Sequence, residues 1–254
     1  MLDRTFLHLP GYSYRRERRL WSRGIFGWDD FIDRFRDSRF HRAQCATLES
    51  SRNALAHSDG NYFGDLLPRE EAWRAFPHFK RIAYLDIETT GLAPQNDHLT
   101  VVGIFDGKDT HSYIHGKNME QFAKDISSYD MVVTFNGSMF DIPFLKSHIP
   151  GLKMPRLHAD LRFILASLNV RGGLKRIEQQ FGLEREDDLK GMNGYDAVLL
   201  WRRYRKSGDE GALDKLVRYN AADISNLKAL MGWAYKEKRG RTGFDDILRA
   251  TVRD

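Results

Sequence analysis

The chain has 254 residues, of which 41% are hydrophobic and 30% charged, and its formal net charge is +5. This length allows one large domain, or a medium-sized domain with an additional region, and it provides a sizeable core. Because Cys45 is the only cysteine and no run of 18 apolar residues occurs, a disulfide scaffold and a membrane-spanning helix are excluded. We expect a soluble, cytoplasmic protein with no membrane partner.

Basic and acidic residues are unevenly distributed along the chain. Lys and Arg outnumber Asp and Glu by 14 to 11 in residues 1–80 and by 13 to 8 in residues 200–254, whereas acidic residues lead by 16 to 13 in residues 81–199. Basic ends around an acidic centre suit a polyanion held at the periphery and cations bound in the middle. An ordinary charged surface fits the same distribution, so charge alone assigns no function.

The first 80 residues are predicted to be helical. A short helix over 14–22 is expected to end at Gly24, because glycine adopts the left-handed conformation that closes helices. From Trp28 the apolar residues step by three and four, which indicates an amphipathic helix. Two further helices are expected over 42–57 and 69–76.

After residue 80 the hydrophobic period changes to two, which indicates a strand over 81–88. The remaining elements are predicted, in chain order, as strands over 99–105, 111–115 and 131–135 and helices over 119–128, from 141, 160–169, 172–181, 194–206 and 210–236. Three meander strands followed by alternating strands and helices favour a mixed, five-stranded α/β sheet flanked by helices.

Asp86 and Glu88 are separated by one residue within the first predicted strand. The period of two places both carboxylates on one face, close enough to hold the same ion. Two like charges at this distance repel unless a cation neutralises them. A solvated strand end is the alternative, since carboxylates usually lie at the surface, and the pair alone is a weak signal.

Two other parts of the chain supply acidic residues at places suited to a site. Asp141 begins a helix directly after the fourth strand, where α/β sheets place ligand-binding groups, although helix capping explains it equally well. Tyr219 and Asp223 are four residues apart on a core-facing helix, so they lie on one face, one turn apart. The alternative for this pair is a packed tyrosine ring beside an exposed aspartate.

Together these carboxylates can converge on two divalent cations. Oxygen ligands without a cluster of Cys or His select hard cations, here Mg²⁺ or Mn²⁺. In phosphodiester hydrolysis, one ion of such a pair activates water and the other stabilises the leaving oxygen. The hydroxyl of Tyr219 is suited to orient that water.

Three motifs resemble those of the DEDDy 3′–5′ exonucleases, the DnaQ-like branch of the ribonuclease-H-like fold. They are Asp86-Ile-Glu88-Thr-Thr-Gly-Leu, Asn136-Gly-Ser-Met-Phe-Asp141 and Tyr219-Asn-Ala-Ala-Asp223. Within this branch the chain is most similar to the YprB-type ribonuclease-H-like domain, which shares Gly173-Leu-Lys-Arg-Ile-Glu178 and Ala197-Val-Leu-Leu-Trp201-Arg-Arg-Tyr. The resemblance covers roughly residues 81–232. It implies a ribonuclease-H-like α/β domain at 79–254 after a helical N-terminal region at 1–78.

The resemblance also implies the roles of the acidic residues. Asp86, Glu88 and Asp223 would bind the metal that carries the nucleophilic water, and Asp86 would bridge to a second ion. Asp141 would hold that second ion. Tyr219 stands where this branch has its tyrosine, so it would position the nucleophile.

Substrate contacts are implied for four further residues. Thr89 and Thr90 would contact the terminal nucleotide, and Leu92 would wedge between the terminal bases. Asn136 would contact the substrate or brace the site. His158 and Asp160, between the second and third motifs, are more simply interpreted as a strand end and a helix cap.

A second resemblance concerns the amino-terminal segment Leu9-Pro-Gly11-Tyr-Ser13-Tyr with its following helix. It resembles one arm of a helix-hairpin-helix element, in which a glycine-bearing turn exposes backbone N–H groups to a phosphate, but serine replaces the usual second glycine. Further phosphate contacts would come from Arg15, Arg16, Arg18, Arg19 and Arg23. A solvated, arginine-rich helix packed on the core is an equal alternative.

These observations and the resemblance together predict a metal-dependent exonuclease acting on single-stranded ends of DNA or RNA, and the resemblance implies its 3′–5′ polarity. Two alternatives stay open. One is a catalytically inactive module that binds nucleic acid, and the other is a structure-specific endonuclease on the same fold. Protein partners are unknown from the sequence.

Overall fold

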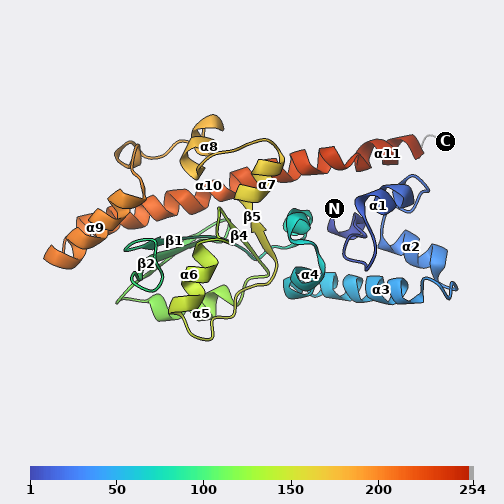
Figure 1. The fold of residues 1–254 in the computed structure, drawn as a ribbon, viewed down its shortest axis with the longest axis horizontal. Coiled ribbons are helices and arrows are strands. Elements are labelled where there is room, and N and C mark those ends of the chain that lie inside the picture. The colour runs from blue at the N-terminus through green and yellow to red at the C-terminus, as the bar shows by residue number, and fades with distance from the viewer. Residues whose placement is uncertain (252–254) are drawn as a thin grey trace.

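The computed structural model describes residues 1–251, and Figure 1 shows their arrangement. Within these residues a mixed sheet of five strands has the order β3-β2-β1-β4-β5. β1 pairs antiparallel with β2 and parallel with β4, while β3 and β5 form the two edges. The strands are β1 Ile82–Thr89, β2 Leu99–Phe105, β3 Thr110–Ile114, β4 Met131–Thr134 and β5 His158–Asp160. The predicted fold class, a mixed five-stranded α/β sheet flanked by helices, is confirmed.

Helices cover both faces of this sheet (Figure 1). The long helix α10 crosses one face, and α5 and α6 cover the other. The elements that follow the first three strands are α5 Met119–Ile126, α6 Asp141–His148, α7 Leu161–Ser167, α8 Leu174–Gln180, the 3-10 helix η3 Asp187–Leu189, α9 Gly194–Ser207, α10 Glu210–Thr242 and α11 Phe244–Thr251.

The alternation of side chains along β1 determines what faces each layer. Leu85 and Ile87 pack into a core with Phe144 of α6. Tyr84 points to the opposite side, where its core includes Leu227 of α10. Asp86 and Glu88 have the same parity as Tyr84, so the sheet directs them toward α10, as the sequence predicts.

The N-terminal region is helical, as predicted, and shares a core with the sheet. Its elements are η1 Leu2–Arg4, α1 Tyr14–Trp21, α2 Trp28–Phe35, α3 Arg42–Ala56, α4 Gly60–Leu66 and the 3-10 helix η2 Arg69–His78. The Trp21 ring packs edge-on against Phe244 of α11, with ring centroids 5.0 Å apart. Phe6 and Phe63 belong to the same buried cluster as Tyr84. We propose that residues 1–78 form an accessory region joined to the domain at 79–254 through this common core.

Several elements differ from the sequence prediction, which does not contain η1, η3 or α11. The sequence does not predict α4, because glycine disfavours helices. Glycine is required at position 60, however, because a Cβ there would lie 1.8 Å from the carbonyl oxygen of Asp130. The helix expected over 69–76 is a 3-10 helix that runs over Arg69–His78 and contains Pro77. Helix α10 continues past 236 until Gly243, whose φ of 71° ends it before α11.

Every helix within residues 1–251 is either too short or too polar to span a bilayer.

Candidate active site

Three carboxylates from two elements meet between the sheet and α10. Asp86 and Glu88 lie on β1 and Asp223 lies on α10, and one oxygen from each side chain lies within 4.8 Å of the others. Glu88 and Asp223 are each 7% exposed, whereas Asp86 is more accessible. The register between β1 and β2 shifts directly after Glu88. Such a bulge locally re-aims a strand, and here it lies at the edge of the carboxylate group.

Asp141 lies beside this group. It begins α6 and is 3% exposed. Its Oδ1 accepts a hydrogen bond from the backbone N–H of Ile87, 3.2 Å away. Because Ile87 separates Asp86 from Glu88 on β1, this bond fixes Asp141 next to both strand carboxylates. The structure thus brings all four predicted carboxylates together, with Asp141 at the margin.

Desolvation and mutual repulsion act on all four carboxyl groups. Burial raises the pKa of Asp86 and that of Glu88 well above their usual ranges, and the neighbouring carboxylates add to both shifts. Burial also raises the pKa of Asp141 to about 7 and that of Asp223 to about 6. A cation among these oxygens would relieve the repulsion and favour the ionised forms. The all-oxygen donor set therefore fits a hard divalent cation.

Two cationic side chains border the carboxylates. Arg185 Nη2 pairs with Asp223 and, at 2.5 Å, with Glu178 of α8, and only 9% of the Arg185 side chain is exposed. Lys175 Nζ donates to the carbonyl oxygen of Met192. The sequence assigns no role to either cation, because their proximity to Asp223 arises from chain folding rather than from a local pattern. The resemblance nevertheless includes Lys175 within a shared segment.

Tyr219 lies one helical turn before Asp223, as predicted, and is 3% exposed. Its ring packs with Val101 and Met192, and Lys175 Nζ lies 4.7 Å from the ring centroid. Burial and the adjacent Asp223 raise the pKa of the Tyr219 hydroxyl above its usual range. The hydroxyl therefore stays protonated near neutral pH and is able to donate a hydrogen bond toward the carboxylate group.

Asn220 is a site residue that the sequence does not predict. It is fully buried on α10, and its Nδ2 donates to Asp86 Oδ2 at 3.0 Å. Gly103 of β2 lies opposite Asp86 in the sheet, and a Cβ at Gly103 would lie 1.9 Å from Asn220 Oδ1. The missing side chain at Gly103 thus gives Asn220 the space to hold Asp86. The sequence does carry one sign of this role, because the polar residue Asn220 stands between the motif residues Tyr219 and Asp223 on a helix that faces the core.

Gly103→Ala is expected to destabilise the fold by about 1–3 kcal/mol, because the added methyl overlaps Asn220 in a packed core. Gly232→Ala is the matched control, since Gly232 lies inside α10 with open space around its Cβ position. There alanine is expected to stabilise by about 0.5–1 kcal/mol. Urea unfolding of both variants measures the difference, and equal stabilities would contradict this packing.

Asp160 stabilises the start of the second motif, Asn136-Gly-Ser-Met-Phe-Asp141, through hydrogen bonds to its backbone. As predicted, His158–Asp160 is a strand end, and Asp160 caps α7 by accepting from the N–H of Arg162. Asp160 also accepts from the backbone N–H of Asn136 at 2.8 Å. Asn136 adopts a left-handed φ of 69°, and its Oδ1 accepts from Arg162 Nη1 at 2.8 Å. These contacts agree with the bracing alternative for Asn136.

The end of β1 and the loop after it carry the other three predicted contacts. Thr89 is buried and donates to the carbonyl oxygen of Gly91 at 2.6 Å. Thr90 donates to Asp97 Oδ1 at 3.0 Å. Leu92 is 83% exposed, so its side chain is free to meet a partner. Both threonine hydroxyls therefore stabilise the loop that presents Leu92.

The arginines that were predicted to contact phosphate lie away from the carboxylate group. Arg15, Arg16 and Arg19 are exposed on α1, which packs against α11 rather than beside the carboxylates (Figure 1). Arg16 Nη1 donates to the carbonyl oxygen of Gly11 at 2.5 Å, which closes the turn before α1. These arginines are thus separated from the carboxylate group by much of the length of α10.

Comparison with protein families decides the assignment of this fold. Residues 83–235 match the RNase H superfamily, and this segment contains all four carboxylates and Tyr219. The chain belongs to the RNase H superfamily. No curated protein matches it. Membership of the RNase H superfamily agrees with the ribonuclease-H-like fold that the motifs imply.

Several solved structures are similar to this RNase H superfamily member. A family B DNA polymerase from the archaeon Pyrobaculum calidifontis has 17% identity and a TM-score of 0.47, over 59% of this chain and 24% of that chain. The present chain therefore spans about a quarter of that polymerase. NrnC from Brucella melitensis with bound Mg²⁺ has 20% identity and a TM-score of 0.46, over 68% and 85% of the two chains. A nuclease in its apo form has 15% identity and a TM-score of 0.49, over 73% and 84%.

Proposed function

We propose that this RNase H superfamily member is a metal-dependent 3′–5′ exonuclease of the DEDDy type, with a YprB-type domain. Its substrates would be single-stranded ends of DNA or RNA. The observation that carries this proposal is the convergence of Asp86, Glu88 and Asp223, with Asp141 beside them, in a fold of this superfamily. The three motifs, in their order along the chain, support the exonuclease assignment.

The carboxylates would hold two divalent cations, Mg²⁺ or Mn²⁺, which supply an activated water and stabilise charge on the leaving oxygen. Asp86, Glu88 and Asp223 are the proposed ligands of one ion, and Asp86 with Asp141 those of the other. Asn220 holds the Asp86 carboxylate from the side of α10. Lys175 and Arg185 bring positive charge to the border of the site, where it would favour the approach of an anionic substrate.

Tyr219 would orient the attacking water through its protonated hydroxyl. Tyr219→Phe is expected to lower the cleavage rate about 100-fold, as the loss of one hydrogen bond made in the transition state does. Metal affinity and thermal stability should stay close to wild type. Tyr129→Phe is the control, because Tyr129 packs on the opposite face of the sheet. A Tyr219→Phe enzyme with an unchanged rate would remove this residue from the mechanism.

The nature of the products tests the proposal against its two alternatives. A 3′–5′ exonuclease releases mononucleotides from the first turnover, whereas an endonuclease releases oligonucleotides first. An inactive binding module retains the oligonucleotide intact while still binding it. Chromatographic separation of early products from a single-stranded oligonucleotide in Mg²⁺ therefore distinguishes all three, and mononucleotides alone support the proposal.

A further inference from the structure

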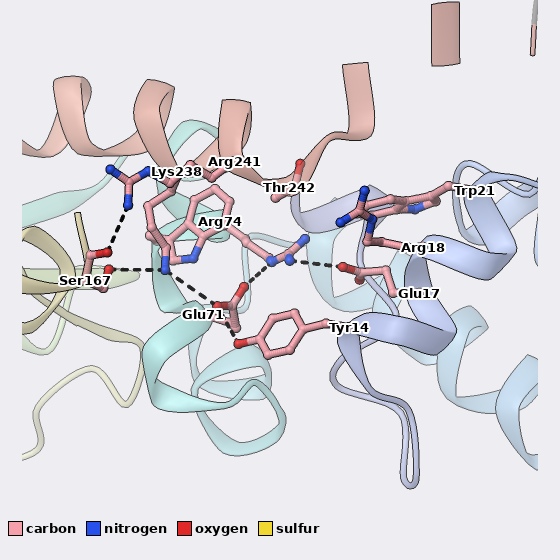
Figure 2. Close-up of a pocket in the computed structure, with 11 residues that line it drawn as sticks. Tyr14, Glu17, Arg18, Trp21, Glu71, Arg74, Ser167, Lys238, Arg241 and Thr242 are labelled. Carbon is pink, nitrogen blue, oxygen red and sulfur yellow. Dashed lines mark hydrogen bonds and ion pairs between the residues drawn. The ribbon is translucent and has the colours of Figure 1, made fainter. Parts of the chain in front are cut away.

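A cavity lined by both charged and aromatic side chains lies far from the carboxylates, where the N-terminal region meets the end of α10. Its volume is about 270 Å³. Figure 2 shows how its lining residues come from α1, η2, α10 and the end of α7. Lys238, in this lining, follows Asp223 by 15 residues on α10, which corresponds to about 22 Å. The cavity is therefore distinct from the proposed active site.

The base of the cavity is a buried ion network centred on Arg74. This side chain is 1% exposed, and its Nη2 lies 3.0 Å from Glu17 Oε1. Its Nε pairs with Glu71, and Tyr14 also donates to Glu71, at 2.9 Å. The third nitrogen, Nη1, is buried and has no hydrogen-bond partner within residues 1–251. In Figure 2 two nitrogens of Arg74 reach the glutamates, while the third is directed toward the α10 side of the cavity.

A second unpartnered donor belongs to the same lining. The indole Nε1 of Trp73 is buried and lacks an acceptor in the described part of the chain. Arginine and tryptophan side chains donate hydrogen bonds and cannot accept them. Leaving buried donors without acceptors is unfavourable, so the cavity favours a ligand that is rich in acceptor oxygens. The volume far exceeds that of one water molecule, which occupies about 30 Å³ in the liquid.

The charges of the lining indicate the sign of the ligand. Arg18, Arg74, Lys238 and Arg241 are opposed by two glutamates, Glu17 and Glu71, which leaves a surplus of two positive charges. Lys238 Nζ lies 4.0 Å from Glu71 and 3.4 Å from Ser167 Oγ, and Arg241 donates to the carbonyl oxygens of Ser167 and Leu168, so a phosphate would add to these contacts. A phosphate monoester carries about −1.5 to −2 charges at neutral pH and offers three acceptor oxygens. Its negative charge would therefore balance the positive surplus of the lining, and its oxygens would accept hydrogen bonds from the buried donors.

Aromatic side chains accompany these cations. The Trp73 ring lies 5.0 Å from Arg74 Cζ and 5.6 Å from Lys238 Nζ, measured to the ring centroid. Tyr14 is 51% exposed, and its hydroxyl is held by Glu71, so its ring is presented in a fixed position. Because Trp73 is only 1% exposed, the Tyr14 ring is the one of these two that is open to stack on a base, while the cations would bind the phosphate.

We propose that this cavity is a second nucleotide site, which binds a nucleoside phosphate through Arg18, Arg74 and Lys238. The ligand is either a free mononucleotide or the 5′-phosphorylated terminal unit of a strand. Both sources present the same phosphate next to a base. This proposal does not depend on catalysis by the carboxylates.

Binding of AMP and adenosine to the full chain tests the site. The protein carries Asp86→Asn and is kept in EDTA, so that the carboxylate group neither cleaves nor holds a metal-bound ligand. Calorimetry is expected to show that AMP binds about tenfold or more tightly than adenosine, because charge-assisted hydrogen bonds to the phosphate are lost in adenosine. A parallel titration compares a short single-stranded oligonucleotide with and without a 5′-phosphate.

Two substitutions locate the binding. Lys238→Gln and Arg18→Gln are each expected to weaken binding of the phosphorylated ligand about tenfold. Lys236→Gln is the matched control, because Lys236 is exposed on α10 and does not line the cavity. Arg74 is left unchanged, since removing a buried ion-pair partner endangers folding. Circular dichroism melting verifies that each variant is folded.

The outcomes separate the two ligand sources and the two proposals. Preference for AMP over adenosine that is lost in Lys238→Gln supports a mononucleotide site. If Lys238→Gln weakens only the binding of the 5′-phosphorylated oligonucleotide and leaves AMP binding unchanged, the result supports a strand-end site. Equal binding with and without the phosphate, or equal affinities of Lys238→Gln and Lys236→Gln, overturns the proposal. Cleavage by the wild-type enzyme would survive that result, because it is measured at the other site.

Discussion

Asp86→Asn is expected to lower the rate of phosphodiester hydrolysis by at least about 1,000-fold. Metal-centred charge stabilisation supplies several kcal/mol, and each 1.36 kcal/mol corresponds to a factor of ten in rate. Asp86 is the proposed ligand common to both cations, so its loss disturbs both. Single-turnover cleavage of a labelled oligonucleotide in Mg²⁺ measures the effect.

The same variant should fold at least as well as wild type in EDTA. Burial and the neighbouring carboxylates raise the pKa of Asp86, which means that its ionised form is unfavourable without a cation. Asparagine removes that charge and still offers an oxygen to Asn220. Asp109→Asn in the exposed turn before β3 is the control for both rate and stability. Wild-type cleavage by the Asp86→Asn enzyme would contradict the site assignment.

Arg185→Gln is expected to cost about 3 kcal/mol or more of unfolding free energy in EDTA, because it leaves buried carboxylates without their counter-ion. Arg185 pairs with both Asp223 and Glu178. A divalent cation at the carboxylate group would replace part of the missing charge. The loss should therefore be smaller in Mg²⁺ than in EDTA. Urea unfolding under both conditions measures this difference.

Arg218→Gln provides the matched comparison. Arg218 pairs with three carboxylates, Glu186, Asp188 and Asp214, one more than Arg185, but 36% of its side chain is exposed. Exposed ion pairs contribute little to stability, so a small loss that does not depend on Mg²⁺ is expected. If Arg185→Gln lost the same free energy with and without Mg²⁺, a cation at Asp223 would not be compensating the charge.

Local pattern was sufficient to predict the parts of the site that depend on periodicity. The alternation along β1 places Asp86 and Glu88 on one face, and the helical repeat places Tyr219 one turn before Asp223. Both periods follow from backbone geometry, which is the same in every strand and helix. The position of Asp141 at the start of α6 was predicted for the same reason, since a strand end and a helix start are visible as a change of period.

Contacts between distant segments could not be predicted in this way. Arg185 meets Asp223 across 38 residues, and no repeat in the chain relates them. Asn220 reaches Asp86 only because Gly103, on a neighbouring strand, lacks a side chain. Similarly, glycine stands at the first position of α4 because the backbone at Asp130 lies too close to Gly60 for a larger residue. In each case tertiary packing decides the role of a residue whose local preference suggests another.

The most direct test of the central claim uses a single-stranded oligonucleotide labelled at its 5′ end. It is incubated with wild-type protein in Mg²⁺, in Mn²⁺ and in EDTA, and with Asp86→Asn in Mg²⁺. We predict a ladder that shortens from the 3′ end in either metal and disappears in EDTA and in the variant. An intact oligonucleotide with wild-type protein in both metals, or a ladder that persists in Asp86→Asn, would contradict a metal-dependent exonuclease at this carboxylate group.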